Sequence, residues 1–273
     1  MRNYVLVTFF CSIFNYTLSQ EVKYIEVENV HFQSNEKVYL FGNDVKLRAK
    51  PSTSSKVLDV LRINSVVDVI AEEDIVFNYN GINWNWIKVS SNNKVGYIIG
   101  GLLSLDNKVI GDSVYLINLK KIDENFQLLI RLVNKNTLEY IELAYDLNNT
   151  DTFSVEVYGN KGLESVKDML LVNFMAEACG IDGGGCYFFN DGKSLTKAIQ
   201  YSQIADGDLY WLNEKVVFPN NYKGVKNKIL FISEHGETIN EEKNYQKITT
   251  ESIECVWEGK FLDIEKIKKS STD

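Results

Sequence analysis

The sequence predicts an all-β protein, in which a small barrel precedes a larger antiparallel β-sandwich or partly open barrel. Apolar and polar residues alternate in short runs, and Asn, Gly, Pro or Ser clusters separate those runs. This pattern is typical of strands joined by turns. No long stretch repeats with the helical period, and a hydrophobic fraction of 45% is ample for packed cores.

The small barrel is predicted over residues 39–105. Apolar and basic residues alternate along Val45–Lys50, which is typical of a strand with one buried face. Pro51–Ser55 then favours a loop that ends this strand. Apolar runs then follow at 57–61, 66–70, 84–89 and 95–99, with turn signals such as Asn92-Asn93 between them. Five short strands in about 65 residues favour a small barrel, because closure removes exposed edges.

The order of these elements resembles the bacterial SH3-like (SH3b) family. The resemblance is carried by six spaced segments, which are Leu47-Arg48, Pro51–Ser54, Val57-Leu58, Trp86–Val89, Gly96–Ile98 and Leu102-Leu103. Three features depart from the family pattern. Lys46 stands where Asn is usual, Lys50 where Gly is usual, and the loop expected from Glu72 to Asn83 is longer than common. These departures bear on loop geometry and ligand choice.

The resemblance implies a non-catalytic binding domain, directed at cell-wall peptidoglycan or at peptides. Aromatic faces stack on sugars and on extended peptides, and the candidate ligand-binding residues are Tyr39, Tyr79, Trp84, Trp86 and Tyr97. Trp86 and Tyr97 also stand where a barrel needs large core residues. Trp84 shares a face with Trp86 unless a bulge intervenes. We expect Trp84 and Tyr79 to be the better candidates for exposed contacts.

The first twenty residues are interpreted as a secretory signal peptide. Arg2 supplies the positive start, Tyr4–Phe14 is largely apolar, and small residues at Thr17–Ser19 allow cleavage around Ser19 or Gln20. The alternatives are a core strand or a short membrane anchor, but the apolar run is too short to span a bilayer. The prediction is export to the periplasm or the extracellular space, with no membrane insertion after cleavage. Residues 21–38 form an N-terminal segment.

The acidic net charge of the chain argues against two classes of binding partner. The net charge is −8 and the isoelectric point is near 5.0. No basic stripe is visible, which argues against nucleic acid as a partner and against adhesion to an anionic membrane surface.

Residues 106–264 are predicted to form the larger β-rich domain of unknown function, and 265–273 a charged, Ser-rich tail. Strand patterns recur at segments such as Phe126–Val133 and Phe153–Val157, while a helix is allowed at Leu163–Asp168 or Ser194–Gln203. The blocks EACG, GGG, YFFNDGK, ADGDLYW and VVFPNN are similar to C-terminal regions of uncharacterised secreted proteins from Bacteroidetes-type bacteria. That similarity implies no particular activity.

Three cysteines remain after signal removal. Cys179 and Cys186 flank a glycine loop, and a disulfide between them is predicted, with buried free thiols as the alternative. A Cys179 or Cys186 nucleophile with His235 as base is a minor alternative. No metal site or cofactor is predicted, because the Cys179–Cys186 gap is longer than zinc-ligand spacing and the aspartates lack a calcium-loop pattern.

The predicted function is therefore that of an exported, non-catalytic binding protein whose SH3-like domain recognises peptidoglycan or a peptide. The alternative is a structural interaction module of the cell envelope with its site for a protein partner on the C-terminal domain. A cell-wall cysteine peptidase is the third hypothesis.

Overall fold

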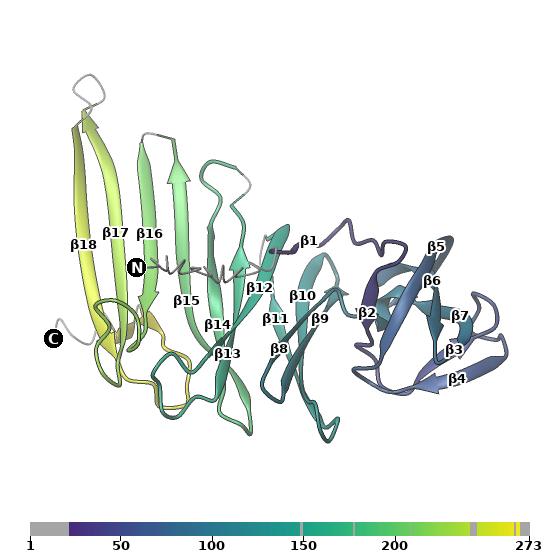
Figure 1. The fold of residues 1–273 in the computed structure, drawn as a ribbon. Helices are drawn as coiled ribbons and strands as arrows, with labels where there is room; N and C mark the ends of the chain where they lie inside the picture. Colours follow the sequence, from purple (N-terminus) through teal and green to yellow (C-terminus); the bar gives the residue numbers. More distant parts are fainter. Residues whose placement is uncertain are drawn as a thin grey trace, which may run out of the picture.

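The computed structural model describes residues 22–147, 150–176, 178–207, 209–240, 245–264 and 266–267. The predicted signal peptide and most of the predicted tail lie outside these ranges. The all-β prediction is confirmed, because the described residues form eighteen strands in three antiparallel sheets (Figure 1). No helix in the described part of the chain is long and apolar enough to cross a membrane.

The first sheet has six strands in the order β2-β5-β6-β7-β3-β4 and curls into the small barrel. Its strands are β2 (Lys37–Tyr39), β3 (Val45–Arg48), β4 (Val57–Leu61), β5 (Val66–Tyr79), β6 (Ile82–Ser91) and β7 (Lys94–Ile99), followed by the 3-10 turn η1 (Gly100–Leu102). The expectation of a long loop at Glu72–Asn83 is wrong. Most of that stretch extends β5 and starts β6, because its β-branched and aromatic residues pair across the hairpin.

Two hairpin turns in the barrel use residues that tolerate positive φ. Asn92 and Asn93 join β6 to β7 with φ of 50° and 60°, as the sequence predicts. Asn80 and Gly81 join β5 to β6 with φ of 54° and 79°. A Cβ added at Gly81 would lie 2.1 Å from the carbonyl oxygen of Lys121, so this turn requires glycine where it meets the second sheet.

The second sheet has four strands in the order β11-β10-β9-β8. They are β8 (Asp106–Ile110), β9 (Ser113–Ile122), β10 (Asn125–Asn134) and β11 (Tyr140–Asp146). The sheet stands between the small barrel and the third sheet (Figure 1).

The third sheet has eight strands in the order β1-β12-β13-β14-β15-β16-β17-β18. They are β1 (Tyr24–Glu26), β12 (Thr152–Gly159), β13 (Asp168–Phe174), β14 (Gly183–Asn190), β15 (Leu195–Asp206), β16 (Tyr210–Val217), β17 (Ile229–Asn240) and β18 (Tyr245–Cys255). Neither allowed helix forms. Ser194–Gln203 lies almost wholly in β15, and Leu163–Asp168 is a turn leading into β13. Both are short segments whose apolar residues fit a strand or a turn once the neighbouring strands pair.

One hydrophobic core runs through all three sheets. It joins barrel residues such as Leu47 and Ile98 to Ile130 of the second sheet and to Phe153 and Phe188 of the third. A second cluster, containing Phe41 and Ile63 of the barrel and Leu116, Leu129 and Val133 of the second sheet, seals the barrel against β9 and β10. The barrel is therefore packed against its neighbour over apolar surface.

The third sheet is buried on both faces at its centre. Cys186 and Phe188 of β14 face the core shared with the second sheet, whereas Tyr187 and Phe189 face a separate cluster. That cluster includes Phe218, Leu262 and Ile264 from connecting and C-terminal segments. Alternation along one strand thus fills two cores.

Candidate functional site

The small barrel carries a groove of about 180 Å³. Its lining comes from β3, the segment before it, the following loop, β6, β7 and η1, and comprises Asn43, Asp44, Val45, Lys46, Arg48, Thr53, Trp86, Ile99 and Leu102. Trp86 and Ile99 are buried beneath the surface and form an apolar floor. Asn43, Asp44, Lys46 and Thr53 are exposed and form a polar rim.

The strand register explains why the floor and part of the rim lie together. Ile99 is directly opposite Trp86, and Tyr97 is directly opposite Lys88, so these four side chains share one face of the β6–β7 ladder. Arg48 pairs with Tyr97 from the other side. The face therefore continues from the apolar floor to a half-buried row of Lys88, Tyr97 and Arg48.

The loop after β3 is fixed to the groove. Arg48 donates from Nη1 to the carbonyl oxygen of Ser55 at 2.8 Å, and the hydroxyl of Ser55 accepts from the Lys50 backbone at 2.9 Å. Ala49 donates to the carbonyl of Lys56 at 2.9 Å. These bonds close the Pro51–Ser55 loop that the sequence predicts, and they hold Thr53 at the rim.

Trp86 is held by its neighbours. It is 2% exposed and meets the ring of Phe77 edge-on, with ring centroids 6.4 Å apart. Such contacts favour a fixed ring orientation. A ligand in the groove would therefore meet a preorganised surface that needs little reordering on binding.

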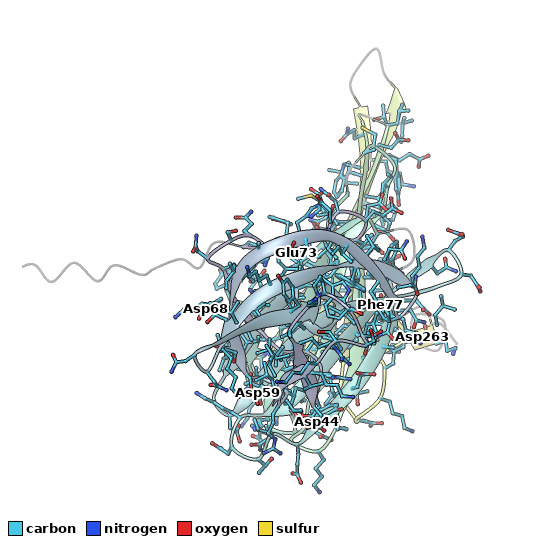
Figure 2. All side chains as sticks on the ribbon, turned by 90° about the vertical axis from the view of Figure 1, so that its right-hand side faces the viewer. Asp44, Asp59, Asp68, Glu73, Phe77 and Asp263 are labelled. Atoms are coloured by element: carbon cyan, nitrogen blue, oxygen red, sulfur yellow. The ribbon has the colours of Figure 1, made fainter. Side chains whose placement is uncertain are left out.

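The groove rim carries charge of both signs. Lys46, Arg48 and Asp44 form no ion pair with any residue that the structure describes. Asp59, by contrast, accepts from Lys94 at 2.9 Å, and this hydrogen bond lowers the pKa of Asp59. Figure 2 faces this end of the molecule and shows Asp44, Asp59, Asp68 and Glu73 around the periphery of the barrel. No described carboxylate neutralises Lys46 or Arg48, so both charges can attract an anionic group, although one nitrogen of Arg48 is already bonded to the Ser55 carbonyl.

The five aromatic residues singled out in the sequence do not form one site. Trp86 lies in the groove floor and Tyr97 borders it on the same face. Tyr39 packs instead against the cluster that joins the barrel to the second sheet. Tyr79 and Trp84 lie nearer the β5–β6 turn, outside the groove lining, and Trp84 is paired there with Phe77.

The expectation that Trp84 is exposed is wrong. Its side chain is 4% exposed, its indole nitrogen donates to the carbonyl of Tyr79 at 3.2 Å, and its ring covers Gly101. Trp84 and Trp86 share a face, as alternation requires, because the irregularity lies in β5 opposite them. Tyr79 is half-buried against the same core.

The rim residues Asn43, Asp44, Lys46 and Thr53 were not predicted from the sequence, nor were Ile99 and Leu102. For Lys46 and Arg48 a signal was present, because they are the outward positions of a strand whose inward positions are Val45 and Leu47. No comparable signal marks Thr53, whose place depends on how the loop closes.

The three cysteines within the described residues are free thiols, contrary to the predicted disulfide between Cys179 and Cys186. Cys179 is exposed in a turn, while Cys186 lies inside β14 and points into the shared core. Burial raises the pKa of the Cys186 thiol to about 12. Cys255 is buried in the cluster on the opposite face of the sheet. Within the described residues, no three His, Cys, Asp or Glu side chains are grouped as a metal site would require.

Comparison with protein families finds a match, which covers the small barrel. Residues 43–104 match the family described as bacterial SH3 domain. The matched range contains every residue that lines the groove. No curated protein and no solved structure matches the chain.

Proposed function

We propose that this chain is an exported, non-catalytic binding protein, and that the groove of its bacterial SH3 domain binds an extended peptide, such as the peptide portion of cell-wall peptidoglycan. The observation that carries the proposal is the combination of a rigid apolar floor, Trp86 and Ile99, with the unpaired cations of Lys46 and Arg48 at its edge. Apolar surface favours a side chain, and the cations favour a carboxylate.

The shape of the site supports a peptide. Trp86, Ile99 and Tyr97 lie along adjacent strands, so the surface is elongated and accepts successive groups of an extended chain. The family match supports the same class of ligand, since bacterial SH3 domains commonly bind peptidoglycan or peptides. Trp86 is too deep to stack its whole face on a sugar, which favours an aliphatic or small side chain over a sugar ring.

The test is co-sedimentation of residues 22–273 with purified peptidoglycan sacculi. Lys46→Glu reverses a rim charge without touching the core, and we expect it to reduce the bound fraction severalfold at low salt. Lys56→Glu is the matched control, because Lys56 is an exposed lysine between β3 and β4 that does not line the groove. Added salt should weaken binding by the parent protein, because exposed charges are screened.

The test needs residues 22–273 and not the barrel alone, because the barrel packs against the second sheet. A fragment ending near residue 105 would expose Phe41 and Ile63, which normally pack on β9 and β10. Binding that is equal for the parent, Lys46→Glu and Lys56→Glu would contradict the groove as the site. Absence of sedimentation by the parent would contradict peptidoglycan as the ligand.

A further inference from the structure

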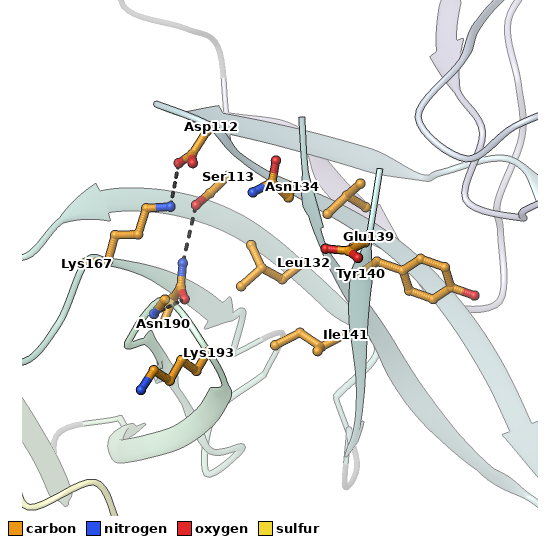
Figure 3. A pocket seen from close by; sticks show the side chains of 12 residues that line it. Asp112, Ser113, Leu132, Asn134, Glu139, Tyr140, Ile141, Lys167, Asn190 and Lys193 are labelled. Atoms are coloured by element: carbon orange, nitrogen blue, oxygen red, sulfur yellow. Dashed lines mark hydrogen bonds and ion pairs between the residues drawn. The ribbon is translucent and has the colours of Figure 1, made fainter. Parts of the chain in front are cut away.

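The second sheet covers only part of the eight-stranded third sheet. The core that the two sheets share contains residues of β12, β13, β14 and β15, but no described residue of β16, β17 or β18. Figure 3 shows the margin of this junction, where Asn190 of β14 donates to the Ser113 hydroxyl of β9 at 3.3 Å. The last three strands lie beyond this junction, and β18 ends the sheet (Figure 1).

β18 is a long and regular edge strand of eleven residues. Its pairing with β17 runs without a shift of register from Cys255, opposite Ile229, to Gln246, opposite Thr238. It contains no proline or glycine, and no strand within the described residues pairs with its other edge. β1, at the opposite end of the sheet, has only three residues. A long open edge presents a row of backbone groups on which another strand can form.

One hydrogen bond shows which backbone groups of β18 point outward. The Thr238 N–H donates to the Leu209 carbonyl oxygen at 2.9 Å, so Thr238 of β17 faces β16. In an antiparallel sheet, both backbone groups of a residue point to the same neighbour, and the direction alternates along the strand. Glu237 therefore faces β18 and its opposite residue Lys247. The same alternation directs four residues of β18 away from β17, namely Gln246, Ile248, Thr250 and Ser252.

We propose that β18 pairs antiparallel with β18 of a second copy of this chain, about a two-fold axis at Thr249. In this register Ile248 lies opposite Thr250 of the partner subunit, and Gln246 lies opposite Ser252 of the partner subunit. The four outward-facing residues of each copy then form about eight backbone hydrogen bonds. The two third sheets become one continuous sheet. This interface lies outside the SH3 domain and does not depend on the function proposed for the groove.

Charge complementarity selects this register. It places Lys247 opposite Glu251 of the partner subunit, and the two-fold axis repeats the contact. Both residues stand at non-hydrogen-bonded positions of the new ladder, where opposite side chains come closest. An axis at Thr250 would instead set Lys247 opposite Ile253, and an axis at Glu251 would set two like charges opposite each other.

The other face of the ladder adds apolar surface. Trp211, Gly236 and Ile248 lie opposite one another on β16, β17 and β18. A Cβ added at Gly236 would be 2.2 Å from the indole nitrogen of Trp211, so the ring lies over Gly236. Ile248, on the next strand, is 61% exposed. In the proposed dimer the two Ile248 side chains are diagonal neighbours within reach of each other, which removes apolar surface from water.

Sedimentation velocity of residues 22–273 at increasing concentration tests the dimer. We expect a reversible monomer–dimer equilibrium with a dissociation constant in the micromolar range. Thr250→Pro removes an outward N–H and no hydrogen bond to β17, so it should weaken the dimer about tenfold or more while the monomer stays folded by circular dichroism. Thr250→Ala is the matched control, because it keeps the N–H and should dimerise as the parent does.

Cysteine cross-linking tests the register, in protein carrying Cys179→Ser because the Cys179 thiol is exposed. Thr249→Cys places two thiols opposite each other on the axis, with a Cα separation of about 4.5 Å that suits a disulfide. Mild oxidation should therefore link the two copies. Thr250→Cys is the matched control, because its two copies are offset along the strands and should stay unlinked.

Charge exchange tests the contact between Lys247 and Glu251. Lys247→Glu should weaken the dimer severalfold, and the further change Glu251→Lys should restore it, because the charges are again opposite. Lys37→Glu makes the same change at an exposed position on β2 and is the control. A chain that stays monomeric at every concentration would overturn the proposal, as would a dimer that Thr250→Pro leaves intact. Linking at position 250 in place of 249 would overturn the register.

Discussion

Asp168 is a buried carboxyl group whose hydrogen bonds come from three neutral side chains, Ser113, Tyr115 and Asn190. These residues lie on β9, β13 and β14, so the group ties the second sheet to the third. A buried polar group that loses a partner keeps the full cost of its desolvation. The stability of this junction therefore depends on each donor.

Tyr115→Phe tests this dependence, because it removes one hydroxyl and keeps the ring. We expect the free energy of unfolding to fall by about 1–3 kcal/mol, measured by urea denaturation. Tyr24→Phe is the control, since Tyr24 is 54% exposed on β1 and should change little. Equal stabilities for the two variants would show that the Tyr115 hydroxyl is not needed.

The three cysteines of the described chain should differ sharply in reactivity. With residues 22–273 at about pH 7, a disulfide-exchange reagent should modify Cys179 quickly and Cys186 and Cys255 only on unfolding, because thiolate character and access control the rate. Burial raises the pKa of both buried thiols, to about 12 for Cys186. Loss of the fast-reacting thiol under non-reducing conditions, restored by reductant, would instead indicate a Cys179–Cys186 disulfide.

At the level of elements, Glu72 fastens the N-terminal segment to the barrel. Its carboxylate accepts from the Phe32 backbone at 2.8 Å and from Asn85 at 2.6 Å, and it lies 2.9 Å from His31. Burial alone would raise the pKa of Glu72, but these hydrogen bonds outweigh it and the pKa is lowered. Glu72 thus helps to hold the segment that leads from β1 into the barrel, together with the Ser34 hydroxyl, which donates to the Ile70 carbonyl oxygen of β5.

The lowered pKa gives a pH dependence with a definite sign. A carboxyl group whose pKa is lower when folded stabilises the protein above its unfolded pKa, and that contribution is lost as pH falls through the folded pKa. Glu72→Gln should therefore be less stable than the parent near neutral pH. The difference should shrink as pH falls below the ordinary value of 4.5. Melting temperatures across this range provide the measurement, and a constant difference would contradict the assignment.

The elements that the sequence predicts well are those set by local chemistry. Alternation marks β3 and β12, and paired asparagines mark the β6–β7 turn. The sequence does not reveal partners distant in the chain, such as the pairing of β1 with β12. The same limit applies to the site. Strand alternation points to Lys46 and Arg48, but the burial of Trp84 depends on its contact with Gly101, seventeen positions further along the chain.

At the scale of the whole molecule, the shared core makes the SH3 domain and the second sheet thermodynamically dependent on each other. Phe41, Ile63, Leu116 and Leu129 are all buried in the cluster where the barrel rests on β9 and β10. Arg131 of β10 adds a hydrogen bond to the Phe41 carbonyl oxygen at 2.5 Å. Separating the two parts would expose these apolar side chains at about 25 cal/mol for each Å².

Calorimetry of residues 22–273 should therefore show one transition that includes both the barrel and the second sheet, with no early melting of the barrel alone. Leu116→Ala places a cavity in this junction and should cost about 2–5 kcal/mol. If the two parts are coupled, it lowers the melting of the barrel although Leu116 lies outside it. Val109→Ala is the control, because Val109 is 46% exposed on β8. A barrel whose amide exchange is unaffected by Leu116→Ala would instead be an independent domain, and binding at the groove could then be studied in isolation.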